Sequence, residues 1–246
     1  MTSPALAVEL PDGTRQYRHP LTGELAPSVT TILKMIAKPR LPDWSAKLAA
    51  TYAVENWSSM EHLFEAEKIE KCRWAHERYS QERRDIGNLV HEAVDAWNAG
   101  RPCDSPPEIG GYLNSYVKFL TQYRPEVLES EVTLWSRTYG YAGTADGIFR
   151  IGGKVVLIDV KTGKRVYEEA ALQVSALAAC DFIIRDDGTE EEIPKVDSLA
   201  VIHVRPRSWH LINVERHYDN LAAFLSAKQL YDWERNVAPY VLEKAA

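Results

Sequence analysis

The stretch that decides the fold is Tyr141-Ala-Gly-Thr-Ala-Asp-Gly-Ile-Phe-Arg-Ile151, which Gly152-Gly153 joins to Lys154-Val-Val-Leu-Ile-Asp-Val-Lys161. A Gly-Gly pair between two strand-like segments is a strong signal for a two-residue hairpin loop. With that loop, Ile151 faces Lys154, and counting back along both strands places Asp146 opposite Asp159. The pattern therefore predicts an antiparallel hairpin on which two carboxylates face each other, with their Cβ atoms about 4.5–5.5 Å apart.

The two facing carboxylates predict a metal site. Like charges opposite each other destabilise a sheet, whereas a divalent cation between them would convert the repulsion into binding. Val155–Val160 is almost wholly apolar and should be a central strand buried on both faces. Asp159 interrupts this strand, and Lys161 lies on the same face two residues later. An alternative is that Asp159 and Lys161 form a buried ion pair with a structural role only, which leaves Asp146 unexplained.

The chemistry of these groups suits hydrolysis of a phosphodiester. Carboxylate oxygens favour hard ions such as magnesium or manganese. A lysine beside such an ion can orient a water molecule or stabilise the charge that develops on the phosphate.

The order Gly-Thr-Ala-Asp146 followed by Asp159-Val-Lys161-Thr resembles the PD-(D/E)XK nuclease superfamily, and within it the branch of RecB nuclease domains, which includes phage-type exonucleases. Gly87-Asn-Leu-Val-His91 upstream and Gln173 downstream also fit that branch, so the resemblance covers about residues 85–185. It implies an α/β fold with a restriction-endonuclease-like core, in which helices flank a central mixed β-sheet. The order of the expected helices and strands along the chain independently predicts a helical N-terminal part packed against a mixed sheet.

The resemblance also implies roles for individual residues and a cofactor. One or two Mg²⁺ or Mn²⁺ ions are the expected cofactor. The metal ligands would be Asp146, Asp159, His91 and the carbonyl of Val160, with Lys161 as the catalytic lysine and Gln173 positioning the DNA or the site. The sequence departs from the branch at Leu177, where a tyrosine is common.

Two of these candidates have a competing interpretation. His91 lies off the apolar helical stripe formed by Ile86, Leu89, Val90, Ala93, Val94 and Trp97. It is therefore either a surface histidine or a ligand, and the resemblance favours a ligand. Glu131, on the strand before the hairpin, is either a third acidic metal ligand or an exposed strand residue.

Composition limits how the chain can contact nucleic acid and which cysteine-based sites it can form. The chain has 246 residues, 45% of them hydrophobic, and a net charge of −6. Nucleic-acid contacts must therefore use local basic patches. One candidate patch comprises Lys34, Lys38, Arg40 and Lys47; the other comprises Lys161, Lys164, Arg165, Arg205 and Arg207. The three cysteines are far apart, so we expect no disulfide framework and no iron–sulfur cluster.

Hydrophobic patterning and turn residues give the expected elements. Helices are expected over residues 30–37, 43–56, 60–99 in two pieces, 111–122, 168–184 and 219–236. Strands are expected over residues 129–136, 141–151, 154–161, 198–205 and 209–215, with a hairpin over 5–19 and a loop over 186–194. Residues 1–84 would form a mainly helical part packed on a nuclease core of residues 85–246.

The sequence thus predicts a metal-dependent DNA nuclease. An exonuclease that processes DNA ends in recombination, repair or phage replication is expected first, with a structure-specific endonuclease as the alternative. A catalytically silent DNA-binding or partner-binding module, or a purely structural α/β protein, would be a different class. DNA is the expected partner, a recombination or single-strand-binding protein is a further candidate, and a homo-oligomer is a candidate state. We find no membrane span or secretory signal, so the expected location is the cytoplasm, that of the host if the protein is phage-encoded.

Overall fold

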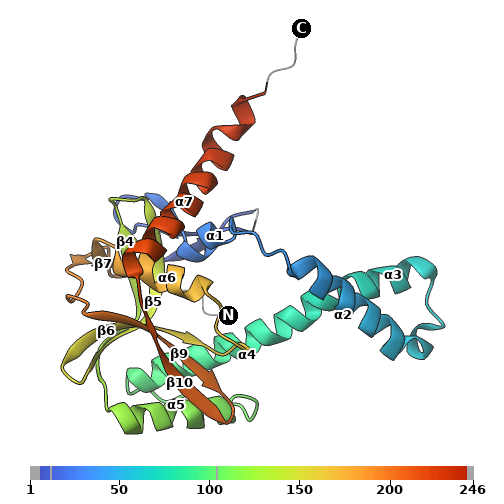
Figure 1. Cartoon of the computed structure of the whole chain (residues 1–246), viewed down its shortest axis with the longest axis horizontal. Helices are drawn as coiled ribbons and strands as arrows, with labels where there is room; N and C mark the ends of the chain where they lie inside the picture. Colours follow the sequence, from blue (N-terminus) through green and yellow to red (C-terminus); the bar gives the residue numbers. More distant parts are fainter. Residues whose placement is uncertain (1–5, 12, 104, 243–246) are drawn as a thin grey trace. The chain divides into compact units, whose positions relative to one another are not determined.

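The computed structural model describes residues 6–11, 13–103 and 105–242 and contains two compact units (Figure 1). One unit includes the described residues up to Ile36 and from Leu89 onward, and the other spans Ala37–Asn88. Every candidate site residue lies in the first unit. Among the described residues, no helix is both long and apolar enough to cross a membrane.

The first unit is built on a seven-stranded sheet of order β10-β9-β6-β5-β4-β7-β8. Its strands are β4 (Glu126–Ser136), β5 (Tyr141–Ile151), β6 (Lys154–Lys161), β7 (Phe182–Ile184), β8 (Glu190–Glu191), β9 (Ser198–Arg205) and β10 (Ser208–Val214). β6 and β9 are parallel and the other neighbours are antiparallel. The sheet is therefore mixed, and helices flank it. This confirms the expected α/β class and is consistent with a restriction-endonuclease-like fold.

The hairpin of β5 and β6 has the predicted register. Gly152 and Gly153 have φ values of 56° and 81°, as a two-residue hairpin turn with left-handed central residues requires. The paired residues run from Ile151–Lys154 to Gly147–Ile158. The ladder ends there, one position before the two aspartates, and further along β5 pairs with β4 while β6 pairs with β9. The sheet thus parts between β5 and β6 where the candidate site begins.

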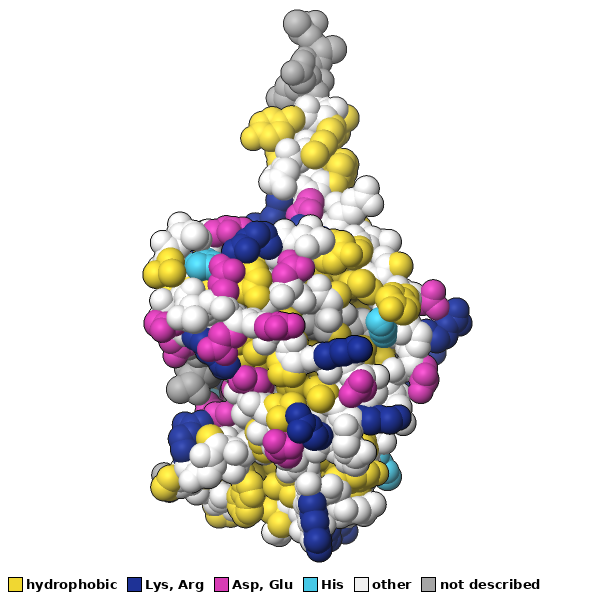
Figure 2. All heavy atoms as spheres, turned by 90° about the vertical axis from the view of Figure 1, so that its left-hand side faces the viewer, with side chains coloured by type: hydrophobic (Ala, Val, Ile, Leu, Met, Phe, Trp, Pro, Cys, Tyr) yellow, Lys and Arg dark blue, Asp and Glu magenta, His cyan; other side chains and the backbone are white. Residues whose placement is uncertain are grey.

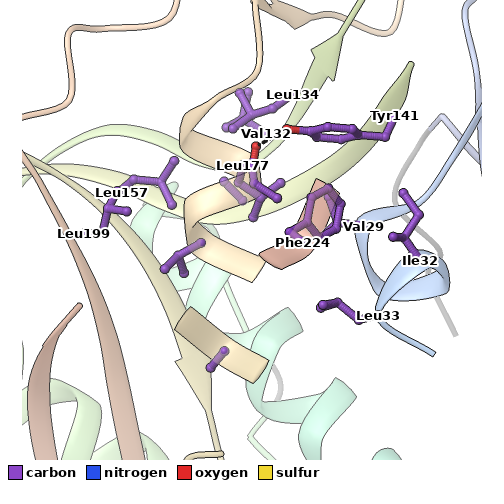
Figure 3. Packing of buried hydrophobic residues seen from close by; sticks show 14 of the residues in the cluster. Val29, Ile32, Leu33, Val132, Leu134, Tyr141, Leu157, Leu177, Leu199 and Phe224 are labelled. Atoms are coloured by element: carbon purple, nitrogen blue, oxygen red, sulfur yellow. Dashed lines mark hydrogen bonds between the residues drawn. The ribbon is translucent and has the colours of Figure 1, made fainter. Parts of the chain in front are cut away.

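Helices cover both faces of the sheet (Figure 1). On one face lie α1 (Val29–Leu33), α6 (Glu169–Ala178) and α7 (His217–Asn236), which pack into the main apolar core. Figure 3 shows Leu177 of α6 and Phe224 of α7 in this core with Leu157 of β6. α5 (Gly110–Tyr123) lies on the other face, where Phe119 contacts Trp209 of β10 edge to face. Burial of each large side chain stabilises the fold by about 1.5–3 kcal/mol, which holds the strand ends in place.

A small antiparallel sheet precedes α1. It consists of β1 (Ala7–Glu9), β2 (Arg15–Arg18) and β3 (Leu25–Pro27), so the hairpin predicted over residues 5–19 is confirmed, although its turn residue Asp12 lies outside the described residues. Ser28 caps α1 by accepting the Thr31 N–H. Ser28 also bridges to Ala142 of β5, which attaches this segment to the central sheet.

The second unit is helical. It contains α2 (Leu41–Asn56), η1 (Ser58–Met60), α3 (Glu65–Arg73) and the first part of α4 (Ala75–Asn98), which continues into the first unit. The helix expected from residue 43 begins at Leu41, so Asp43 lies in its first turn. Pro42 does not break the helix there, because the first N–H groups of a helix need no intrahelical partner.

The helix expected over residues 168–184 is wrong at its end. α6 stops at Ala178, and Phe182–Ile184 forms β7, which pairs with β4. A short apolar run is compatible with a buried helix or a buried strand, and here pairing with the edge of β4 decides the outcome. The expected loop over 186–194 contains the short strand β8, and α7 is followed by η2 (Ala238–Tyr240).

Candidate metal centre

Three adjacent strands and one helix carry four candidate ligands, and three of these, without Asp159, form one close group. Asp159 lies on β6, Asp146 on β5, Glu131 on β4 and His91 on α4. One ligand atom from each of His91, Glu131 and Asp146 lies within 4.8 Å of the other two. Mg²⁺ holds oxygen ligands at about 2.0–2.1 Å, so two ligands on opposite sides of one ion are about 4.2 Å apart. A small contraction of this group would therefore suffice to hold an ion.

Glu131 has an unusual backbone conformation for a strand residue. Its φ is 46°, in the left-handed region, although its neighbours Ser130 and Val132 pair regularly with Gly147 and Ala145 of β5. A non-glycine residue in this region costs about 1–2 kcal/mol. The surrounding ladder supports this strained conformation, and the Glu131 carboxylate lies among the other candidate ligands.

Asp146 is held by two contacts. Its Oδ2 accepts the Val160 N–H at 2.5 Å, and its Oδ1 lies 3.3 Å from Nδ1 of His91. The carboxylate thus bonds to the backbone of β6 just past the end of the β5–β6 ladder. The resemblance implies that the Val160 carbonyl binds the metal. In the structure, the backbone N–H of Val160 donates to Asp146.

Asp159, Lys161 and Gln173 form a second group. Nζ of Lys161 donates to Oδ1 of Asp159 at 2.8 Å and to Oε1 of Gln173 at 3.0 Å. Asp159 is 2% exposed, and its Oδ2 has no hydrogen-bond partner among the described residues. An unsatisfied buried acceptor costs about 1–3 kcal/mol, and more if it is charged. A cation at Oδ2 would remove that cost.

Burial and mutual repulsion disfavour the ionised form of two of the carboxyl groups, those of Asp159 and Glu131. Burial raises the pKa of Asp159 to about 6, against the lowering effect of Lys161. Burial together with the charge of Asp146 raises the pKa of Glu131 to about 7. A bound cation would stabilise the ionised form of both carboxylates, so cation binding and their ionisation favour each other.

The remaining groups are stabilised in their charged forms. Burial alone would lower the pKa of His91, but the adjacent Asp146 carboxylate raises it to about 9. Burial would raise the pKa of Asp146, but His91 and Lys161 lower it below its usual range. Burial opposes the charge of Lys161, yet Asp159 and Asp146 raise its pKa, so its ammonium stays protonated and acts as a donor. Without metal, a protonated His91 therefore supplies positive charge beside Asp146.

Asp95 is a neighbouring group that the sequence reasoning missed. It lies one turn after His91 on α4, and its Oδ1 accepts the Ser130 hydroxyl at 2.9 Å. Its charge contributes to the raised pKa of Glu131. The signal in the sequence was its spacing of four residues from His91, which puts both side chains on one side of a helix.

The solved structures with some similarity to the chain include two at low sequence identity. No protein-family model and no curated protein matches it. It is similar to the crystal structure of SSO0001, with a TM-score of 0.36 and 13% identity over 85% of this chain and 83% of that chain. It is also similar to an alkaline exonuclease (LHK-Exo) from Laribacter hongkongensis, with a TM-score of 0.33 and 13% identity over 63% of this chain and 86% of that chain. Similarity at this level does not assign a function to the chain.

Proposed function

We propose that the protein is a metal-dependent DNA nuclease that hydrolyses phosphodiester bonds. One observation carries the proposal: His91, Glu131 and Asp146 converge within 4.8 Å, while the nearby Asp159 holds Lys161 and has a buried oxygen that no described residue contacts by a hydrogen bond. A purely structural Asp159–Lys161 pair would need neither this convergence nor the strained backbone of Glu131.

The donor set suits one or two Mg²⁺ or Mn²⁺ ions. His91, Glu131 and Asp146 would hold the first ion, and Oδ2 of Asp159 would face the same space or a second ion. Carboxylate oxygens favour magnesium and manganese, and the imidazole nitrogen suits a transition metal, so manganese fits at least as well as magnesium. When bound, such an ion lowers the pKa of a coordinated water and offsets charge on the phosphate.

Lys161 would act as a hydrogen-bond donor to the reacting groups. Its ammonium is held between Oδ1 of Asp159 and Oε1 of Gln173, so two of its three N–H donors are already directed. The third can reach a phosphate oxygen or the attacking water. Because Asp159 holds Lys161 with one oxygen and leaves the other for a cation, the Asp-x-Lys spacing sets the ammonium and the metal side by side.

The choice of DNA ends as the substrate rests on the resemblance to RecB-like and phage-type nucleases. We propose an exonuclease of DNA recombination, repair or phage replication, working with DNA and with a recombination or single-strand-binding protein. Figure 2 shows acidic and basic side chains interspersed over one face of the molecule, without a broad surface of one sign. Together with the net charge of −6, this favours contacts made by a few local basic groups.

The test is cleavage of end-labelled linear DNA and of closed circular DNA with Mg²⁺ or Mn²⁺. Wild-type protein should degrade linear DNA only, and Lys161→Ala should reduce the rate by about 10²–10⁴-fold. Lys154→Ala is a matched control, since this exposed lysine lies at the opposite end of the same strand. Cutting of circles would indicate an endonuclease. Folded wild-type protein that binds metal and cuts neither substrate would indicate the silent binding module.

A further inference from the structure

A basic pocket of about 630 Å³ lies at the turn between β9 and β10. It is lined by Lys164, His203, Arg205, Pro206, Arg207, Ser208 and His210. Of these described lining residues, three are cations, two are histidines and none is acidic. In a chain with a net charge of −6, such a concentration of positive charge marks a site for an anion.

The pocket is built from a tight hairpin and the loop after Lys161. Arg205 pairs with Ser208 and His203 pairs with His210, which leaves Pro206 and Arg207 as the turn. Side chains two residues apart on a strand lie on one face, so His203 and Arg205 both line the pocket from β9. Lys164 enters from the loop that follows β6.

Hydrogen bonds fix this loop to the hairpin. Nη1 of Arg205 donates to the carbonyls of Thr162 at 2.7 Å and Gly163 at 2.9 Å. Nε2 of His203 donates to the same Gly163 carbonyl at 2.8 Å. A guanidinium has five N–H donors, and both of these bonds use Nη1. The donors on Nη2 and Nε are therefore available to a ligand as far as the described contacts show.

The pocket lies beside the candidate active site. Lys161 pairs with His203 in the parallel ladder of β6 and β9. Arg205 is two residues further along β9, which corresponds to about 6.6 Å of strand. Both sites therefore lie at the same end of two neighbouring parallel strands, close enough for one short stretch of nucleic-acid backbone to reach both.

We propose that this pocket binds a backbone phosphate of the DNA strand being cut, close to the cleaved bond. The inference rests on the proposed nuclease function and adds a second contact point for its substrate. Arginine and lysine bind phosphate oxygens through charge-assisted hydrogen bonds, and arginine can bind two oxygens at once. Arg207 is exposed at the turn and can meet the phosphate, whereas Arg205 both binds it and holds the loop in place.

The experiment measures DNA binding by fluorescence anisotropy with Ca²⁺, without relying on cleavage. The probes are oligonucleotides in which one phosphate at a time is replaced by a neutral methylphosphonate. One replacement close to the cleaved bond should weaken wild-type binding by about 10-fold and have no further effect on Arg207→Gln. That variant should bind unmodified DNA about 10-fold more weakly, and the slope of log K against log salt should fall by about 1.

Arg150→Gln is the control, because this exposed arginine lies at the hairpin end of β5 and forms a surface salt bridge with Glu126. Lys164→Gln, in the opposite wall of the pocket, is the second test variant, and thermal melting checks that each variant folds. Wild-type affinity and salt dependence in both pocket variants, or no DNA binding by the wild type, would overturn the proposal. Binding through the pocket without cleavage would support the phosphate pocket and reject the nuclease function. Cleavage with unchanged DNA binding in the pocket variants would support the nuclease function and reject the phosphate pocket.

Discussion

Oδ1 of Asp146 lies 3.3 Å from Nδ1 of His91. This contact stabilises the Asp146 carboxylate in the absence of metal, and the pKa of Asp146 is lowered, whereas the pKa values of Glu131 and Asp159 are raised. The negative charge of Asp146 therefore stabilises the metal-free protein, whereas the negative charges of Glu131 and Asp159 destabilise it. Removing different ones should have opposite effects on stability.

Glu131→Gln should stabilise the metal-free protein at pH 8, where Glu131, with a pKa of about 7, is mostly ionised. The expected gain in the free energy of unfolding is about 1–3 kcal/mol, because an unfavourable buried charge is removed. Asp146→Asn should lower the same free energy by about 1–3 kcal/mol, because His91 loses its partner. Urea unfolding in EDTA measures both changes. Equal destabilisation by the two variants would contradict this account of the site.

Metal binding should strengthen as pH rises from about 6.5 to 9. The pKa of His91 is raised from 6.5 to about 9, so the folded protein holds this proton through a range in which the unfolded chain has lost it. The stabilisation is complete below pH 6.5 and is lost as pH rises through 9. A metal must displace the proton, so Mn²⁺ affinity should rise by up to about 10-fold per pH unit. Calorimetric titration at several pH values measures it; pH-independent affinity would exclude His91 as a ligand.

Gln173→Leu should slow cleavage by about 10-fold through the turnover number, with little change in KM. The variant removes the Oε1 acceptor that holds Lys161 at 3.0 Å, so the ammonium samples unproductive positions. Gln173→Glu keeps an acceptor at the same place and should restore much of the rate. Steady-state kinetics distinguishes the two, and a normal turnover number for Gln173→Leu would show that Asp159 alone positions the lysine.

Gly111→Ala should lower the free energy of unfolding by about 1–3 kcal/mol. A Cβ at this position would lie 2.9 Å from the Pro206 carbonyl oxygen and 3.0 Å from its Cα, so α5 and the β9–β10 turn would have to separate. Gly110→Ala is the matched control, since a Cβ there meets no atom within 4 Å. Denaturant unfolding compares the two, and similar stabilities would show that the turn adjusts without strain.

The hairpin could be predicted from the sequence because its information is local. Gly152-Gly153 sets the loop, and period-two counting then places Asp146 and Asp159 one position past the last observed pair. The strand β7 could not be predicted in the same way. Its residues form a short apolar run soon after the end of α6, and the pairing of Ile183 with Leu134 distinguishes the strand from a continued helix.

The rest of the site depends on contacts between distant segments. Nothing in the alternation around Glu131 encodes a left-handed φ, so the sequence left open whether its carboxylate joins the site. His91 was proposed from resemblance, because helical geometry shows only that it lies off the apolar stripe. The predicted basic patch was partly found: Lys164, Arg205 and Arg207 share a pocket, while Arg165 stacks on Tyr167.

The left-handed backbone of Glu131 has a consequence for how this chain would respond to selection. Glycine adopts a φ of 46° without a steric penalty, so a glycine at this position would relax the strand and remove a buried acid at once. A library screened only for thermal stability without metal should therefore accumulate glycine at 131 and discard the carboxylate. Stability of the metal-free protein and metal binding thus require different residues at this position, and selection for stability alone would remove a metal ligand of the proposed site.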